Sequence, residues 1–294
     1  MGSDLVSDIG DGLSDLGDGV SSLVSEIGEG VSDLTDGKDL TRSSQPAGAL
    51  EDQPALETAA PVGDFSSLDG RKQGWGQGVQ VDDQNRPLSP LTFQEKYGKY
   101  DAYFIGENEK VLYLTFDEGY ENGYTPKILD TLKQKGVKAV FFVTLDYVKS
   151  QPELIQRMID EGHMVGNHSD KHPCFPEVDA QRREQEIRNV DQYMADNFGY
   201  TSMNLFRPPA GEFSEQVLAQ MQAMGYKTVF WSYAYKDWDP DHQMGAAKAL
   251  EKVTGALHNG AIYLLHAVSK DNADILGDFI DTAQKQGYEF KLFS

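Results

Sequence analysis

The sequence predicts an α/β fold in which about seven parallel strands form a barrel-like sheet. Short apolar runs rich in β-branched and aromatic residues alternate with longer segments whose apolar residues recur every three or four positions. This alternation of strands and helices favours parallel strands, because parallel neighbours need a crossover connection that is usually a helix. The predicted strands are residues 111–116, 138–144, 163–167, 204–207, 227–232, 260–265 and 289–293.

Helices are predicted between these strands, and several end in the manner expected of a helix stop. The segments TPKILDTLKQKG, PELIQRMIDEG, SEQVLAQMQAMG and NADILGDFIDTAQKQG each finish on glycine, which readily takes the left-handed conformation that follows a helix. Further helical patterns cover residues 178–198 and the segment GAAKALEKVTGAL. We interpret residues 73–294 as one folded domain.

An 18-residue unit is repeated at the start of the chain. Residues 3–20 and 21–38 match at 12 of 18 positions, and their aliphatic residues form a stripe at helical spacing. Glycines within the stripe, and nine acids in residues 1–36 without any lysine or arginine, disfavour a stable helix. Residues 1–38 are therefore either a disordered spacer or an amphipathic helix that self-associates or tethers the chain to the cell envelope. Residues 39–72, rich in Pro, Ala, Ser and Gly, are predicted to be a flexible linker.

Composition argues against several classes of function. The net charge is −21 and no basic run is present, whereas nucleic-acid binding needs clustered lysine and arginine. No apolar run approaches the roughly 18 residues of a membrane span. A single cysteine, Cys174, excludes an internal disulfide framework. The chain does not start with an export signal, and the opening Met1–Gly2 is compatible with removal of one.

Two adjacent carboxylates, Asp117 and Glu118, follow the predicted strand YLTF directly, and a glycine-containing turn comes next. Paired acids alone are usually solvated surface residues. Their position is more informative, because parallel α/β folds place functional residues at the carboxyl ends of strands.

His168 and His172 follow the predicted strand HMVGN in the sequence HSDKH. Imidazoles four residues apart lie together on one turn of a helix, although this spacing also occurs by chance. Two histidines and one carboxylate form a familiar metal site with open coordination positions. With a carboxylate at another strand end, the hypothesis is a site for a divalent metal.

Three more predicted strands end in residues that suit catalysis or sugar binding. Arg207 begins the segment RPPAG, and its guanidinium can donate two hydrogen bonds to a carboxylate. Asp237 and Trp238 follow the strand KTVFWS, and an aromatic face beside a carboxylate suits a sugar ring. His266 ends the strand AIYLLH, where an imidazole can act as a general acid or base. Five such strand ends converge on one edge of the sheet and predict an active site there.

These segments, in this order, resemble the five motifs of polysaccharide deacetylases of the NodB-homology type, carbohydrate esterase family 4. TFDEG resembles the first motif, HSDKH the second, RPPAG the third, the DW of YKDW the fourth and LLH the fifth, within residues 73–294. The segments GWGQG, EKYGKYDAYFIG, TFDEGYENGYTPK and GAIYLLHAVSKDNA are similar, more particularly, to muramic δ-lactam-type peptidoglycan de-N-acetylases. Those enzymes act on N-acetylmuramic acid.

The resemblance implies a distorted (β/α) barrel with a divalent metal, zinc being the expected ion, and a role for each motif residue. Asp117 is the expected general base and His266 the expected general acid. Arg207 is expected to hold Asp117, and Asp237 to support the side of the site formed by His266 and Arg207. The expected metal ligands are Glu118, His168 and His172.

The resemblance also implies a set of substrate-binding residues around the acetyl group. The backbone N–H of Ala210 is expected to hold the oxyanion, and Trp238 and Leu264 are expected to line the acetyl pocket. The full expected set is Tyr120, Asn122, Pro209, Ala210, Gly211, Trp238 and Leu264.

Three positions depart from the family pattern. Glu118 stands where most members have aspartate, so the charge is kept on a side chain one methylene longer. Ala210 replaces a frequent tyrosine, which opens the groove for a bulkier lactyl or peptide-bearing muramate. Ala234 stands where many members carry a further acid.

The sequence thus predicts a metal-dependent hydrolase that removes the N-acetyl group of peptidoglycan amino sugars, N-acetylmuramic acid in particular. We expect it at the cell envelope or outside the cell, with the peptidoglycan glycan strand as its substrate and no nucleic-acid partner. Two alternatives stay open. One is deacetylation of chitin-like or xylan polymers, and the other is a glycan-binding module that has lost catalysis through the change at Glu118.

Overall fold

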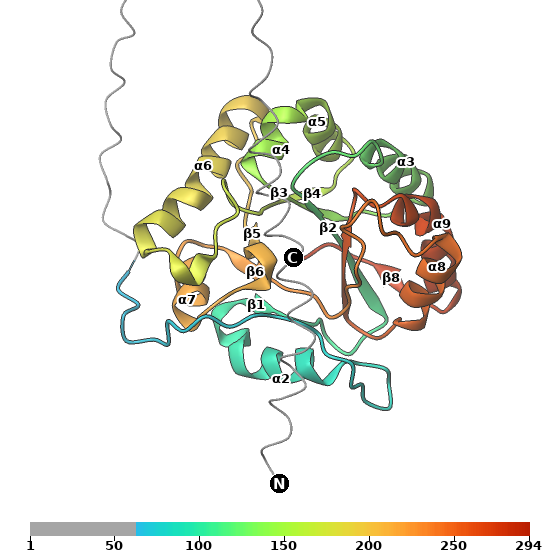
Figure 1. Ribbon diagram of the computed structural model, residues 1–294, viewed down its shortest axis with the longest axis horizontal. Coiled ribbons are helices and arrows are strands. Elements are labelled where there is room, and N and C mark those ends of the chain that lie inside the picture. Colours follow the sequence, from blue (N-terminus) through green and yellow to red (C-terminus); the bar gives the residue numbers. More distant parts are fainter. Residues whose placement is uncertain (1–62) are drawn as a thin grey trace, which may run out of the picture.

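A curved, parallel sheet forms the centre of the computed structural model, which describes residues 63–294, and helices surround this sheet (Figure 1). The strand order is β1-β6-β5-β4-β3-β2-β7, and β8 pairs with β2. Every pairing between these strands is parallel. The predicted α/β fold, a distorted barrel of about seven parallel strands, is confirmed.

The strands of the sheet agree closely with the predicted runs. They are β1 (Ala102–Tyr103), β2 (Val111–Glu118), β3 (Val140–Val143), β4 (Met164–Asn167), β5 (Leu205–Phe206), β6 (Lys227–Val229), β7 (Ala261–His266) and β8 (Glu289–Phe290). The seven predicted strands correspond to β2 through β8. The two-residue strand β1 was missed because it is too short to show a periodic pattern.

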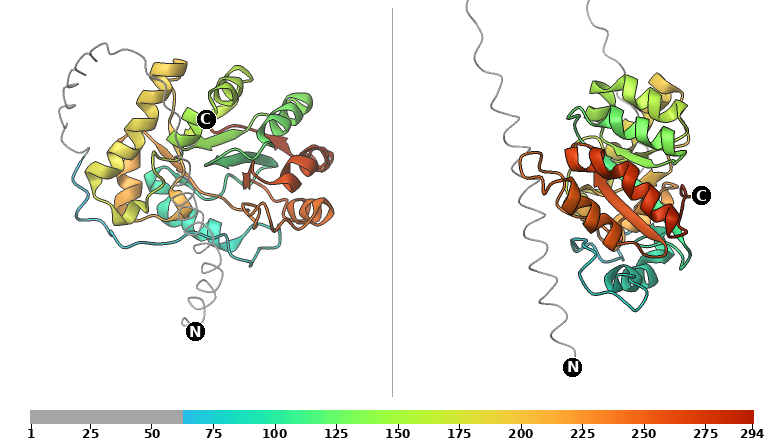
Figure 2. Two further views of the ribbon diagram at one scale, coloured as in Figure 1. Left: turned by 45° about the horizontal axis from the view of Figure 1, so that its top comes forward. Right: turned by 90° about the vertical axis from the view of Figure 1, so that its right-hand side faces the viewer.

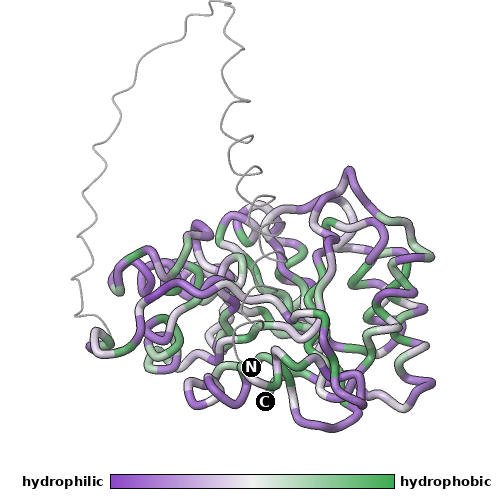
Figure 3. Tube along the Cα trace, turned by 60° about the horizontal axis from the view of Figure 1, so that its bottom comes forward, coloured by the Kyte–Doolittle hydropathy of each residue, from purple (hydrophilic) through white to green (hydrophobic). Residues whose placement is uncertain are grey.

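The helices that connect the strands lie on the outside of the sheet. They are α2 (Leu88–Tyr97), α3 (Thr125–Lys135), α4 (Leu145–Ser150), α5 (Pro152–Asp160), α6 (Ala180–Phe198), α7 (Glu215–Ala223), α8 (Ala246–Gly255) and α9 (Lys270–Lys285). The glycine stops predicted from sequence include Gly136, which follows α3 in the left-handed conformation. Hydropathy alternates along the turns of the helices, as expected when one face of each packs inward (Figure 3).

Alternate residues of the central strands face opposite sides of the sheet. On β2, Leu112, Leu114 and Phe116 belong to a buried cluster formed with residues of the surrounding helices. Phe142 of β3 and Leu264 of β7 belong to a different cluster, inside the barrel. Because side chains alternate with a period of two, the odd-numbered residues of β2 face the interior and the even-numbered ones face the helices.

The segment after β6 fills the gap between β6 and β7. Its Ser232 and Tyr233 donate backbone N–H groups to the carbonyl of Ile262, at 3.0 and 3.1 Å, and Tyr233 in turn accepts from the N–H of Leu264. Residues 234–238 therefore run alongside β7 toward its carboxyl end. Helices α8 and α9 pack side by side on this flank (Figure 2).

The predicted repeat, residues 1–38, and residues 39–62 of the predicted linker lie outside the described residues. Residues 63–72 are described, and part of them contacts α7. The backbone N–H of Gln216 donates to Asp69 O at 3.3 Å, and its side-chain amide donates to Leu68 O at 3.1 Å. Within residues 63–294, no helix has both the length and the apolar character needed to cross a membrane.

Candidate active site

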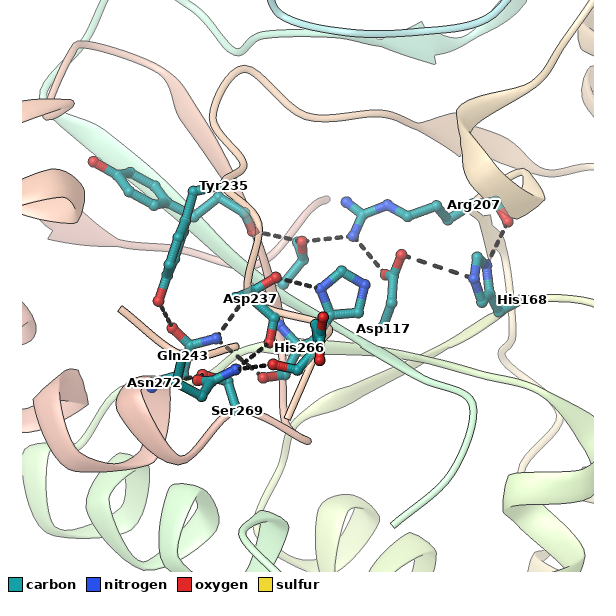
Figure 4. Close-up of polar contacts among 12 residues, drawn as sticks. Asp117, His168, Arg207, Tyr235, Asp237, Gln243, His266, Ser269 and Asn272 are labelled. Atoms are coloured by element: carbon teal, nitrogen blue, oxygen red, sulfur yellow. Dashed lines mark hydrogen bonds and ion pairs between the residues drawn. The ribbon is translucent and has the colours of Figure 1, made fainter. Parts of the chain in front are cut away.

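Asp117 and His266 lie side by side at the carboxyl ends of two neighbouring strands. The register of the sheet pairs Asp117 of β2 with His266 of β7, and both residues belong to the face of their strand that points into the barrel. Only 9% of Asp117 is exposed, whereas His266 is half-buried. Two titratable groups therefore stand next to each other at the rim of the sheet (Figure 4).

Arg207 fixes Asp117 from inside the barrel. Its fully buried guanidinium donates to Asp117 Oδ1 at 2.7 Å, and its other bonds go to Thr115 Oγ1 at 2.8 Å and to two backbone carbonyls. The guanidinium also lies 4.3 Å from the centre of the Phe142 ring. Four hydrogen bonds leave it little freedom, so the carboxylate that it binds is held in one place.

The electrostatic surroundings of Asp117 keep it charged although it is buried. Burial by itself favours the neutral acid. The positive charge of Arg207, with a smaller contribution from His266, outweighs burial and holds the pKa of Asp117 below its ordinary value. The carboxylate is therefore ionised at neutral pH and can accept a proton.

Asp237 fixes His266 in a matching way. Its carboxylate, 1% exposed, accepts from His266 Nδ1 at 2.7 Å and from the backbone N–H of His266 at 2.9 Å. Because a carboxylate only accepts, Nδ1 carries the proton and Nε2 is the nitrogen left for a substrate. Burial opposes the charged imidazole, but Asp237 outweighs this and raises the pKa of His266 above its ordinary value.

His168 and His172 come together in a loop rather than on the helical turn that their spacing had suggested. Residues 168–172 are irregular, with left-handed φ angles of 72° at Ser169 and 54° at His172, and the two rings are 4.9 Å apart. The Nδ1 of His168 lies 2.8 Å from the carbonyl of Arg207, so Nδ1 carries the proton and Nε2 keeps its lone pair. That Nε2 is 3.8 Å from Asp117 Oδ2.

Both imidazoles are in the neutral form that can ligate a metal. Burial lowers the pKa of His168, and burial together with the neighbouring His168 lowers the pKa of His172 to about 3. A neutral imidazole with a free ring nitrogen is a common metal ligand. The pair therefore supplies two of the three ligands predicted from the motifs.

Glu118, the third predicted ligand, does not join these histidines. Strand β2 continues through Glu118, where it pairs with Val143, so adjacent Asp117 and Glu118 point to opposite faces of the sheet. Glu118 is fully buried on the helix side, and neither carboxylate oxygen has a hydrogen-bond partner. Burial, followed by the nearby acids Glu121 and Asp117, raises the pKa of Glu118 well above its ordinary value.

The predicted metal set of Glu118, His168 and His172 is consequently not assembled. Within residues 63–294, no three His, Cys, Asp or Glu side chains are placed so that they could hold a metal ion. The two imidazoles lie together and fit a metal site, but the carboxylate of Glu118 lies on the other face of the sheet. The cause is the two-residue period of the strand, which turns these adjacent acids to opposite faces of the sheet.

The loop of residues 209–211 is held rigidly and presents Ala210 to the outside. Pro209 and Gly211 are buried, whereas Ala210 is exposed and has a left-handed φ of 53°. A Cβ on Gly211 would lie 2.7 Å from the indole of Trp231, and its φ is 67°, so only glycine fits there. Trp231 is itself held by Gln77, whose side chain bonds Trp231 Nε1 at 3.0 Å and Ala234 O at 2.8 Å.

The remaining predicted substrate residues lie around the rim in different ways. The half-buried ring of Trp238 is 6.2 Å from the His266 ring, and Leu264 is an inward-facing residue of β7, two positions before His266. Tyr120 is 39% exposed. The side-chain amide of Asn122 donates to Val268 O at 2.9 Å, so it joins the loop after β2 to the loop after β7.

Four residues of the site were missed in the sequence. Thr115 could have been found, because it precedes Asp117 by two positions and so shares its face of β2. Gln77, Tyr235 and Asn272 lie within the segments GWGQG, YKDW and GAIYLLHAVSKDNA that carry the family resemblance, but the sequence did not assign them a bonding partner. Their bonds across the fold join residues 35 to 157 positions apart, and Asn272 also bonds His266 O six positions away.

Comparison with known proteins decides the family. Residues 105–229 match the family described as polysaccharide deacetylase. The peptidoglycan-N-acetylmuramic acid deacetylase PdaA of Bacillus subtilis is 50% identical over 194 residues, which are 66% of this chain and 74% of that protein. The chain belongs to the polysaccharide deacetylases.

Solved structures agree with this assignment and confirm the resemblance seen in the motifs. The structure of Bacillus subtilis PdaA, a family 4 carbohydrate esterase, superposes on the deacetylase with a TM-score of 0.72 at 45% identity, covering 76% of this chain and 95% of that one. A family 4 carbohydrate esterase from Bacillus anthracis has a TM-score of 0.63 at 40% identity with the same coverage. The family is generally metal-dependent.

Proposed function

We propose that this deacetylase hydrolyses the N-acetyl group of N-acetylmuramic acid in peptidoglycan and releases acetate. The observation that carries the proposal is the in-register pair of Asp117 and His266, each held by its own charged partner. The similarity to PdaA, a peptidoglycan-N-acetylmuramic acid deacetylase, supports the choice of sugar.

In this mechanism Asp117 acts as the general base. It accepts a proton from the water whose oxygen forms a bond to the acetyl carbon. Arg207 keeps the carboxylate charged and aimed into the site, so the base is ionised before the substrate arrives. A base fixed within hydrogen-bond reach of the attacking water contributes about 10²–10⁴-fold to such reactions.

His266 acts as the general acid on the other side of the scissile bond. Its raised pKa favours the protonated ring, and Nε2 gives its proton to the sugar nitrogen as the carbon–nitrogen bond breaks. Acetate and a free amino sugar are the products. The backbone N–H of Ala210 is assigned to the oxyanion, a role worth roughly 3–4 kcal/mol in acyl-transfer enzymes. Trp238 and Leu264 form the walls of the acetyl pocket.

Zinc is the expected ion if His168 and His172 carry a metal, since imidazole nitrogen is a preferred ligand of zinc. When bound, such an ion polarises a carbonyl and acidifies water. Because Glu118 faces the helices, the described residues do not complete the predicted metal site.

The proposed substrate places the deacetylase at the cell envelope. Residues 73–294 are the proposed catalytic domain, with residues 39–72 as a linker. Residues 3–38 are proposed to act as a spacer, or as a segment that self-associates or tethers the chain.

The test is acetate release from three acetylated substrates: peptidoglycan strands, chitooligosaccharides and xylan. The proposal expects release from peptidoglycan, with muramic acid as the deacetylated sugar, and none from the Asp117→Asn variant. Release from chitooligosaccharides or xylan alone would show that the polymer is different. Binding to glycan strands without any acetate release would identify a binding module instead.

A further inference from the structure

A second layer of polar side chains lies directly behind His266 and Asp237. Asn272, in the first turn of α9, is 1% exposed, and its side-chain nitrogen lies 2.6 Å from Asp237 Oδ2 and 3.0 Å from His266 O. Its side-chain oxygen lies 2.5 Å from the hydroxyl of Tyr235. Figure 4 shows that Asn272 stands between Tyr235 on one side and the Asp237–His266 pair on the other.

The chemistry of these neighbours fixes which way the Asn272 amide is turned. Asp237 Oδ2 and His266 O are acceptors, so the group facing them must be the NH₂, which has two hydrogens to give. Turning the amide over would set oxygen against oxygen at both contacts. Tyr235 then donates its hydroxyl hydrogen to the amide oxygen, and every polar atom of Asn272 is used.

Asn272 bonds both the carboxylate of Asp237 and the backbone of His266. One N–H of its amide bonds the carboxylate that holds the imidazole, and the other bonds the backbone of His266 itself. Asp237 thus receives three donors: the imidazole N–H, the His266 backbone N–H and Asn272. Its carboxylate cannot rotate away from His266 Nδ1 without breaking the bond to Asn272.

We infer that Asn272, oriented by Tyr235, is a positioning residue for the general acid, which keeps Asp237 bonded to His266 Nδ1 and Nε2 aimed at the leaving nitrogen. The inference rests on the proposed function, because that function gives His266 the role of the acid. The role requires a side chain that donates twice and accepts once. Aspartate has the same shape but, when ionised, only accepts, and alanine does neither.

The first experiment measures kcat and KM for acetate release by Asn272→Asp and Asn272→Ala. Side chains that orient metal ligands typically contribute about 10–100-fold, and we take this range as a guide for a residue that orients a general acid. We expect kcat to fall by about tenfold or more in both variants, with KM within about twofold, because the acid loses alignment and the sugar contacts stay. If only side-chain volume mattered, Asn272→Asp would keep the wild-type kcat, and that result would overturn the inference.

Two further variants separate positioning from folding. Tyr235→Phe removes a single hydroxyl donor and should lower kcat by about threefold, in line with the loss of one hydrogen bond. Asn85→Gly is the matched control. The amide of Asn85 also donates twice, to Gly255 O and Leu257 O, but far from His266 in the chain, and its φ of 62° suits glycine. We expect kcat of this control to equal that of the wild type. If kcat fell equally in the control and in the Asn272 variants, Asn272 would have only a general structural role.

A second readout does not depend on activity. The readout is the ¹⁵N spectrum of the imidazole side chains, in which the His266 signals are assigned with the His266→Gln variant. In the wild type, neutral His266 should carry its proton on Nδ1. In Asn272→Ala, the proton should exchange between Nδ1 and Nε2. An unchanged Nδ1–H tautomer in that variant would refute the positioning role. If the wild type releases no acetate from any glycan, the proposed function fails, and these spectra still decide whether Asn272 orients the ring.

Discussion

Replacing Glu118 with leucine should stabilise the deacetylase and leave its chemistry intact. Glu118 is fully buried on the helix side of β2, and both carboxylate oxygens lack a hydrogen-bond partner. A buried polar group without a partner costs about 1–3 kcal/mol. Leucine is of similar size and would add apolar contact with the buried cluster on the helix side of the sheet, which includes Phe116 and Val143. The free energy of unfolding should therefore rise by about 1–3 kcal/mol, and Tm by about 2–4 °C for each kcal/mol.

The gain should also depend on pH. Burial and two nearby acids raise the pKa of Glu118, so above its ordinary pKa the folded protein holds a proton that the unfolded chain has released. Stability of the wild type then falls as pH rises, because the folded state binds more protons. Glu118→Leu lacks this loss, so its advantage should be smallest below the ordinary pKa of glutamate, about 4.3, and should grow as the pH rises above it.

Urea unfolding of the wild type, Glu118→Leu and Glu118→Gln measures the stability, and zinc titration with acetate release measures the site. The matched control is Asp117→Asn, a change at the next residue on the opposite face of the strand, which should abolish activity. A Glu118→Leu variant that lost zinc affinity or fell tenfold in kcat would refute the placement of Glu118 on the helix side.

Three other substitutions test the supports of the site. Arg207→Lys cannot reproduce the four hydrogen bonds of the buried guanidinium and should lower the free energy of unfolding by about 3–5 kcal/mol, seen in urea titration; unchanged stability would contradict the buried pair. Gly211→Ala places a Cβ 2.7 Å from an indole carbon at a left-handed φ, so we expect a loss of at least about 1–2 kcal/mol by calorimetry, and a stability equal to wild type would show that the loop yields. Asp237→Asn removes the charge that raises the pKa of His266, so the alkaline limb of the kcat–pH profile should move to lower pH; a limb that stays in place would mean that another group is the acid.

Most of the fold and the main residues of the site could be predicted from the sequence. Strands show a dense apolar signal, and parallel strands deliver their carboxyl ends to one edge, so Asp117, Arg207 and His266 could be grouped from the order of strands and motifs alone. Glu118 shows the limit of this reasoning. The motif placed it in a ligand set by its position in the sequence, while the strand period turned it to the other face.

The residues that support the site from a distance could not be predicted from local sequence patterns. Asn272, at the start of a predicted helix, and Gln77 are uncharged amides whose bonds to Asp237 and Ala234 span 35 and 157 positions of the sequence. Their roles depend on the direction of single hydrogen bonds. Such contacts are set by how the segment after β6 crosses to β7, which no local pattern encodes.

The most direct test of the acid–base pair is the rate of N-acetylmuramic acid deacetylation by Asp117→Asn and His266→Gln, followed by mass spectrometry of digested peptidoglycan strands. Circular dichroism and urea unfolding would first establish that both variants fold. We expect each variant to lose about 10²-fold or more in kcat, because each removes one of the two proton transfers. A folded variant of either residue that converted the sugar within tenfold of the wild-type rate would contradict this expectation.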